Sequence, residues 1–132
     1  MSLLLVALIA VSVLTGCNEN TPPDASEIEA RDIGQGSVEF RFEVTDNEEE
    51  TTVWNVRTDE VTIGAALVEV GLIGGEEASF GLMVIYVNGL RADFNQDGAY
   101  WAFYIDGEFA STGVDSTETE PDKVYAFVYT SA

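Results

Sequence analysis

Apolar and polar residues alternate strictly between residues 37 and 44, which is the pattern of a half-buried strand. The apolar positions, which would face a core, are Val38, Phe40, Phe42 and Val44. A turn with a solvated run of acidic residues follows at 46–50. Residues 51–57 predict a second strand, with Trp54 and Val56 on one face. We therefore expect these two strands to form a hairpin.

A single amphipathic helix is predicted after this hairpin. Thr62 is the expected N-cap, with Asp59 as the alternative. The residues that share one apolar stripe are Ile63, Ala66, Leu67 and Val70. Gly71 stands where a helix end favours a left-handed residue, and the glycines and glutamates at 74–77 are typical of a loop. We expect the stripe to bury against a sheet, where its partners would be Phe40, Phe42, Val84 and either Trp101 or Phe103.

Three further strands and one short returning strand are predicted in the second half of the chain. Residues 82–87 are apolar on both faces, which is typical of a central strand, and Asn88-Gly89 ends it. Residues 100–106 form the next strand and 123–129 the last, with a short returning strand at 108–112 after the Asp106-Gly107 turn. Strands with one helix on one face of a mixed sheet make an α+β domain, and a single β-grasp-like domain fits this description.

The first residues read as a targeting signal and not as part of the fold. Residues 3–14 are apolar except for one serine and are too short to span a bilayer. They end in Leu14-Thr15-Gly16-Cys17, which resembles the lipobox of bacterial lipoproteins. That resemblance implies a signal peptide over 1–16 and a lipidated Cys17, hence a membrane-anchored, extracytoplasmic protein. Residues 17–36 would then be an acidic flexible tether, with a short helix at 28–33 as the alternative, and 37–132 the domain.

Composition narrows the function classes. The chain has 132 residues, five basic against 24 acidic ones, a formal net charge of −19, no His and one Cys. The charge argues against binding to nucleic acid or to anionic lipid. The absence of His removes the Ser-His-Asp and Cys-His nucleophile systems, and one Cys forms no internal disulfide. We therefore expect no catalytic residues and no enzyme activity.

One acidic segment has the spacing of a partial calcium loop. Asp93, Asn95 and Asp97 occupy the first, third and fifth positions of an EF-hand pattern, and Gly98 the sixth. The twelfth position, however, is Tyr104 in place of the bidentate Glu, and the flanks predict strands. We expect a polar turn and no metal site here.

The aromatic residues of the strand at 100–106 are the candidate ligand-binding residues. Alternation places Trp101, Phe103 and Ile105 on one face and Tyr100, Ala102 and Tyr104 on the other. One set would fill the core under the helix. The other would form either a small second core under loops or a ligand platform. Tyr100, Trp101 and Tyr104 are the candidates, although alternation opposes all three sharing one face.

A longer resemblance covers residues 58–129. It rests on Thr62-Ile-Gly-Ala-Ala-Leu67, Asn88-Gly-Leu-Arg-Ala-Asp93, the run from Tyr100 to Ala110 and Thr112-Gly-Val-Asp115. These motifs are similar to those of the transcobalamin-like C-terminal domain family. The resemblance implies a β-grasp-like fold related to the β-domain of cobalamin carriers, which closes over one face of a corrinoid.

Two function classes follow from the sequence. The first is a lipid-anchored binding module for a small molecule, with a corrinoid as the ligand that the resemblance suggests and no resident cofactor. The alternative is a surface adhesion or interaction domain for a protein or glycan partner. Because the chain has no His and its Cys lies in the expected anchor, a corrinoid would be held by aromatic and backbone contacts and not by a bond to cobalt.

Overall fold

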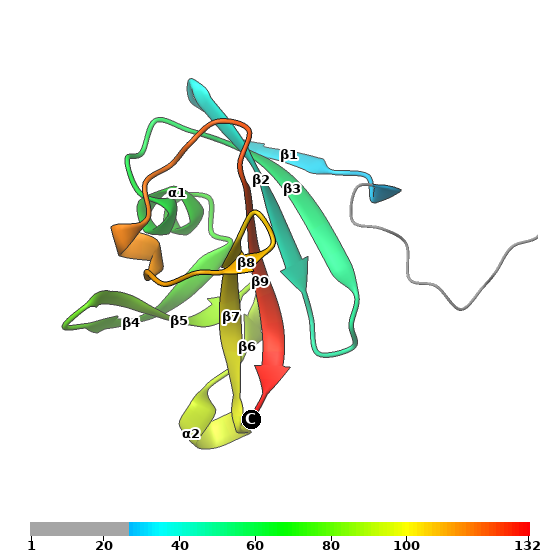
Figure 1. Ribbon diagram of the computed structural model, residues 1–132, viewed down its shortest axis with the longest axis vertical. Coiled ribbons are helices and arrows are strands. Elements are labelled where there is room, and N and C mark those ends of the chain that lie inside the picture. The colour runs from blue at the N-terminus through cyan, green and yellow to red at the C-terminus, as the bar shows by residue number, and fades with distance from the viewer. Residues whose placement is uncertain (1–26) are drawn as a thin grey trace, which may run out of the picture.

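A six-stranded mixed sheet carries the fold in the computed structural model, which describes residues 27–132 (Figure 1). Its strand order is β1-β3-β2-β9-β7-β8. The strands are β1 (Arg31–Gly34), β2 (Val38–Thr45), β3 (Thr51–Thr58), β7 (Ala99–Ile105), β8 (Glu108–Phe109) and β9 (Val124–Ser131). The predicted signal peptide, Cys17 and the first half of the predicted tether lie outside the described residues.

The strongly alternating segments form the predicted strands. β2 and β3 pair as an antiparallel hairpin with Phe42 opposite Trp54, and β9 joins β2 in parallel. β7 pairs antiparallel with β9. One element was not predicted: β1 runs parallel to β3 with Ile33 opposite Val56. The end of the segment expected to be a tether is therefore part of the sheet, and the alternative helix at 28–33 is not present.

A second, three-stranded sheet lies beside the first. It consists of β4 (Ile73–Ala78), β5 (Gly81–Val87) and β6 (Leu90–Arg91), all antiparallel. The prediction of a loop at 74–77 is therefore wrong, because these residues pair with β5. The prediction that β5 is buried on both faces is also wrong, since Met83 and Tyr86 are exposed. β5 is central only within this small sheet.

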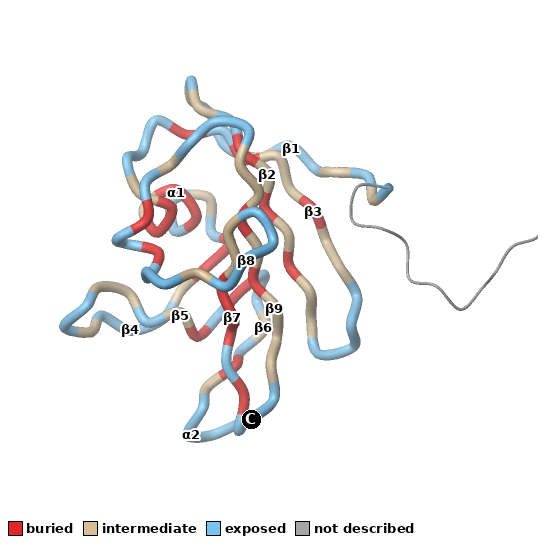
Figure 2. Tube along the Cα trace, in the orientation of Figure 1, coloured by how far each residue is buried: buried red, intermediate tan, exposed pale blue. Residues whose placement is uncertain are grey.

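Helix α1 (Ile63–Glu69) packs on one face of the large sheet, as predicted. The Thr62 hydroxyl accepts the Ala65 N–H at 3.2 Å and caps the helix. Ile63 and Leu67 are fully buried with Phe40 and Phe42, whereas Val70 and Val84 are only partly buried. Trp101 and Phe103 both belong to this core, so the two alternatives are realised together. Figure 2 shows the buried residues gathered along α1 and the middle strands.

Two short helical segments complete the described part of the chain. α2 (Phe94–Asp97) is a single turn capped by Asp93, where a polar turn was expected, so the prediction of one helix is incomplete. The 3-10 turn η2 (Val114–Ser116) lies against α1 and β5. The mixed sheet with α1 on one face agrees with the predicted class, and the β-grasp assignment stays a prediction. In residues 27–132 no helix has the length and apolar character needed to cross a membrane.

Candidate ligand cleft

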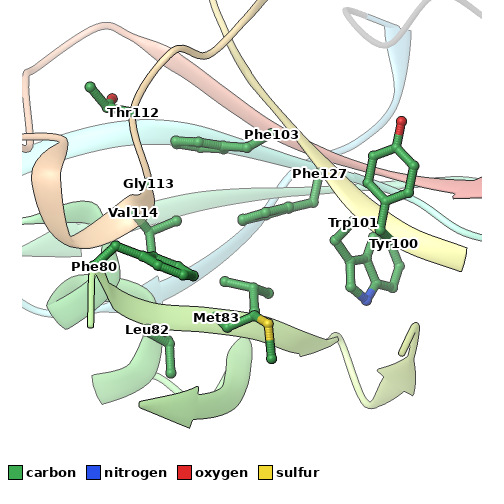
Figure 3. A pocket seen from close by; sticks show the side chains of 11 residues that line it. Phe80, Leu82, Met83, Tyr100, Trp101, Phe103, Thr112, Gly113, Val114 and Phe127 are labelled. Carbon is green, nitrogen blue, oxygen red and sulfur yellow. The ribbon is translucent and has the colours of Figure 1, made fainter. Parts of the chain in front are cut away.

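An open apolar cleft of about 230 Å³ lies between β5, β7 and the loop that leads into η2 (Figure 3). We call it the β7-edge cleft. Its lining residues are Phe80, Leu82, Met83, Val84, Tyr100, Trp101, Phe103, Thr112, Gly113, Val114 and Phe127. Phe80, Met83 and Tyr100 are 63%, 42% and 40% exposed, so apolar surface at its rim is open to solvent. Exposed aromatic surface around a concave site is typical of ligand binding.

The cleft borders the edge of β7 as well as the sheet face that carries Trp101, Phe103 and Phe127. Tyr100 and Trp101 are consecutive residues of β7, so their side chains project from opposite faces. Both nevertheless line the cleft. A hollow that contacts residues from both faces of one strand has to reach the strand's edge. Alternation in the sequence places these two rings on opposite faces of β7. The structure brings both to the cleft because the cleft reaches the edge of the strand.

Tyr104, the third predicted ligand-binding residue, is not part of the cleft. Its ring packs edge-on against Phe109 of β8, with centroids 5.8 Å apart. On its strand it pairs with Phe109 on one side and with Ala126 of β9 on the other. Tyr104 therefore belongs to the small aromatic pair at the end of β7, directly after Phe103, the last residue of the strand that lines the cleft.

Trp101 is held in one orientation at the inner end of the cleft. Its indole Nε1–H donates a hydrogen bond to the Ile85 carbonyl oxygen at 3.0 Å, which ties β7 to β5. Its ring meets Tyr129 edge-on at 5.5 Å between centroids. Phe103 stacks on Phe127 at 5.0 Å behind it. These contacts give the cleft a preformed aromatic floor.

The wall at residues 112–114 is fixed by polar contacts outside the cleft. The Thr112 and Thr117 hydroxyls lie 2.9 Å apart, and the Thr117 hydroxyl donates to the Gly113 carbonyl oxygen at 2.9 Å. Asp115 Oδ2 accepts the Leu82 N–H at 2.8 Å and so fastens the loop to β5. The Thr112-Gly-Val-Asp115 motif thus positions one wall of the cleft against the other.

The described residues that line the cleft include no Asp, Glu, Lys, Arg or Cys. The shifted ionisable groups lie elsewhere. Hydrogen bonding to Arg91 lowers the pKa of Asp97, and the Val124 N–H together with Lys123 lowers the pKa of Asp106. Burial raises the pKa of Tyr125, whose hydroxyl donates to the Glu118 carbonyl oxygen at 3.1 Å. The cleft is therefore suited to binding and offers no acid–base pair.

The acidic turn considered for calcium is satisfied by protein donors. Asp97 accepts from Arg91 Nη2 at 2.9 Å and Nε at 3.0 Å, and from the Asp93 N–H at 3.0 Å. Asp93 Oδ1 accepts the Asn95 N–H at 2.9 Å. Within residues 27–132, no cluster of three or more His, Cys, Asp or Glu side chains is placed to hold a metal ion.

Only Tyr100 and Trp101 of the cleft's lining residues were predicted, and Phe80, Met83 and Gly113 are among those that were not. Phe80 lies in the turn between β4 and β5, Met83 on the exposed face of β5, and Gly113 in the loop before η2. Phe80 carried a weak signal, because it is an aromatic residue next to a glycine in a stretch of small and acidic residues. Met83 gave none, since the continuous apolar run of β5 resembles a buried strand.

The comparisons with known proteins agree with this fold. A family model described as "Domain of unknown function (DUF4430)" matches residues 60–130. No curated protein sequence matches the chain. A crystal structure of a "putative metal binding protein" from Ruminococcus gnavus superposes with a TM-score of 0.68 at 21% identity, covering 73% of this chain and 99% of that one.

A second solved structure is that of haptocorrin in complex with Cbi. It superposes with a TM-score of 0.60 at 22% identity and covers 71% of this chain. The match spans only 25% of the haptocorrin chain, so this chain spans about a quarter of its length. At these identities the two structures establish the likeness of the fold.

Proposed function

Because the chain belongs to the family described as Domain of unknown function (DUF4430), and shares its fold with part of a corrinoid carrier, we propose that it is a binding module and not an enzyme. The ligand is a small molecule with an apolar face, held in the β7-edge cleft. The observation that carries the proposal is the cleft itself: a preformed aromatic floor with an exposed apolar rim and no charged lining residue.

A corrinoid is the ligand class that best fits this proposal. The cleft, at about 230 Å³, is below the usual range for enclosing a drug-sized ligand, so it would hold one side of a larger flat molecule. A bare metal ion is a poor fit, because the lining has no His, Cys or carboxylate to coordinate it. Apolar contact therefore carries the binding, and much of the ligand stays in water. We expect an affinity no tighter than micromolar, about −8 kcal/mol.

The cellular location that we propose rests on the sequence alone. Leu14-Thr15-Gly16-Cys17 supports lipidation at Cys17 and an extracytoplasmic, membrane-anchored protein. Such an anchor is firm when two or more acyl chains are attached, since each buried CH₂ contributes about 0.8 kcal/mol. The module would then present its cleft at the outer surface of the membrane.

Equilibrium dialysis of the purified full chain against dicyanocobinamide tests the ligand. We expect saturable binding that weakens about fivefold or more in Phe80→Ser, since this ring forms the cleft rim. Phe94→Ser is the matched control, because Phe94 is equally exposed, at 62% against 63%, but lies on α2 away from the cleft. Tyr100→Ala and Tyr86→Ala form a second such pair, at 40% and 46% exposure.

The outcomes separate the two function classes. Binding that is lost in Phe80→Ser and Tyr100→Ala but kept in both controls supports the proposal. Binding that is unchanged in all four variants would place the site elsewhere on the domain. No saturable binding up to about 1 mM, which corresponds to about −4 kcal/mol, would overturn corrinoid binding and favour a protein or glycan partner.

A further inference from the structure

The backbone of β7 offers unused hydrogen-bonding groups to the cleft. In an antiparallel strand, alternate residues direct both their N–H and C=O groups to the same side. The Gly98 carbonyl oxygen accepts the Ala132 N–H at 2.8 Å, and the Asp106 N–H donates to the Val124 carbonyl oxygen at 2.7 Å. Even-numbered residues therefore turn toward β9. Trp101 and Phe103 turn their backbone groups to the opposite edge.

β8 covers only one end of that opposite edge of β7. β8 pairs with Tyr104 and Ile105, and the Ala110 N–H donates to the Phe103 carbonyl oxygen at 2.9 Å. Beyond this point, the Trp101 N–H, the Trp101 C=O and the Phe103 N–H have no hydrogen-bond partner among the described residues. Trp101 and Phe103 are also among the residues that line the cleft.

Such groups need a partner in this environment. Trp101 and Phe103 are 7% and 8% exposed, and the surrounding walls are apolar. Backbone donors and acceptors that the protein leaves unpaired at a concave, mostly apolar site can be satisfied by a ligand, and a ligand that supplies the matching groups gains affinity. Along this edge, the Trp101 N–H, the Trp101 C=O and the Phe103 N–H follow one another in a row as donor, acceptor and donor. An amide group matches this row because it carries both an N–H and a C=O.

We infer that the free edge of β7 at Trp101 and Phe103 is an amide-recognition strip, and that the ligand of the cleft carries an amide beside its apolar face. The inference rests on the proposed function in that it uses the same cleft. Charge supports a neutral amide over a carboxylate, because the chain has a net charge of −19 and no basic residue lines the cleft. Two sources supply this chemistry: a carboxamide-bearing small molecule, or the backbone of an extended peptide added as a strand.

Amide hydrogen exchange measured by NMR on the full chain tests the strip directly. In the free protein, the Trp101 and Phe103 amides should exchange at least tenfold faster than those of Tyr100, Ala102 and Tyr104, which face β9. Saturation with the probe that binds, either dicyanocobinamide or a capped peptide of alternating valine and lysine, should slow exchange at Trp101 and Phe103 by at least tenfold. The three amides that face β9 are the internal control, and their exchange should change little.

Paired probes identify the source of the amide. The first pair is dicyanocobinamide and the heptamethyl ester of dicyanocobyrinic acid, which keeps the ring but has no N–H donors on its side chains. The second is a capped peptide of alternating valine and lysine and the same peptide N-methylated at alternate residues. We expect the member with N–H groups to bind at least tenfold more tightly in one pair. A preference in the first pair indicates a small-molecule carboxamide, and one in the second indicates a peptide strand.

Three results would overturn the inference. The first is equal protection of all five β7 amides in the free protein, which would mean that the edge is already paired. The second is equal binding of both members within each pair. The third is no binding of any probe at 1 mM. If cobinamide binds and depends on Phe80 while the ester binds equally well, the proposed function stands and the amide strip alone fails.

Discussion

The contact between Asp115 and Gly64 offers the sharpest test of how the wall of the cleft is held in place. Asp115 accepts the Leu82 N–H at 2.8 Å and lies against the first turn of α1. A Cβ atom added at Gly64 would overlap the Asp115 carboxylate and come within 3.2 Å of Val114 Cγ2. An alanine at position 64 therefore forces Asp115 to leave its hydrogen bond, or the wall to shift.

Two opposing terms set the magnitude. Gly→Ala in a helix stabilises by up to about 1 kcal/mol when nothing blocks the methyl group. Displacing Asp115 removes a hydrogen bond worth about 0.5–1.5 kcal/mol. Gly64→Ala should therefore be close to neutral in the natural protein. In an Asp115→Ala background the obstacle is gone, and the same substitution should stabilise by up to about 1 kcal/mol. The double-mutant cycle should show a coupling of about 1 kcal/mol.

Urea unfolding of the parent, the two single variants and the double variant measures this coupling. Ala65→Gly is the matched control, since it makes the reverse change one residue along α1 and should cost about the same in both backgrounds. A coupling below about 0.3 kcal/mol, with Gly64→Ala stabilising both backgrounds equally, would refute the contact. The wall at residues 112–114 would then be held by the threonine contacts alone.

Three further outcomes are expected. Leu67→Ala should cost about 2–5 kcal/mol in urea unfolding, because Leu67 is fully buried, and a loss below about 1 kcal/mol would contradict the packing of α1. Mass spectrometry of the membrane fraction should find a diacylated or triacylated Cys17 at the mature N-terminus, and any other N-terminus would refute the anchor. Millimolar calcium should leave the melting midpoint unchanged, because protein donors already occupy Asp93 and Asp97, and a rise of several degrees reversed by chelator would show that they bind an ion.

Alternation predicted the strands whose two faces differ. β2 and β9 each bury one row of side chains under α1 and leave the other row less covered, so period two is visible in their burial as well as in their sequences, whereas β3 and β7 also bury Val53 and Ala102 on the other face. The helix was equally predictable, since the Thr62 cap and the stripe through Leu67 both act locally. In these elements local pattern and tertiary packing agree.

Elements without a burial contrast could not be predicted in this way. β4 has two glycines, two exposed glutamates and a register shift at Gly74/Gly75, so its sequence resembles a loop although it pairs along its whole length with β5. β1 has one apolar residue, Ile33, and is held by backbone pairing to β3 with an Asn55–Asp32 side-chain bond of 3.2 Å. Strand pairing of this kind depends on the neighbouring strand and not on the segment's own pattern.

The cleft shows why ligand residues are harder to predict than core residues. Alternation assigns each side chain of a strand to a face, and on that basis Tyr100 and Tyr104 belong together and Trp101 does not. What decides the site is where the neighbouring strand stops. β8 pairs with β7 only at Tyr104 and Ile105, so the Tyr104 ring packs against Phe109, while Tyr100 and Trp101 flank the unpaired part of the edge. The length of β8 depends on both strands and on the turn between them. This length decides that Tyr100 and Trp101 line the cleft and that Tyr104 does not.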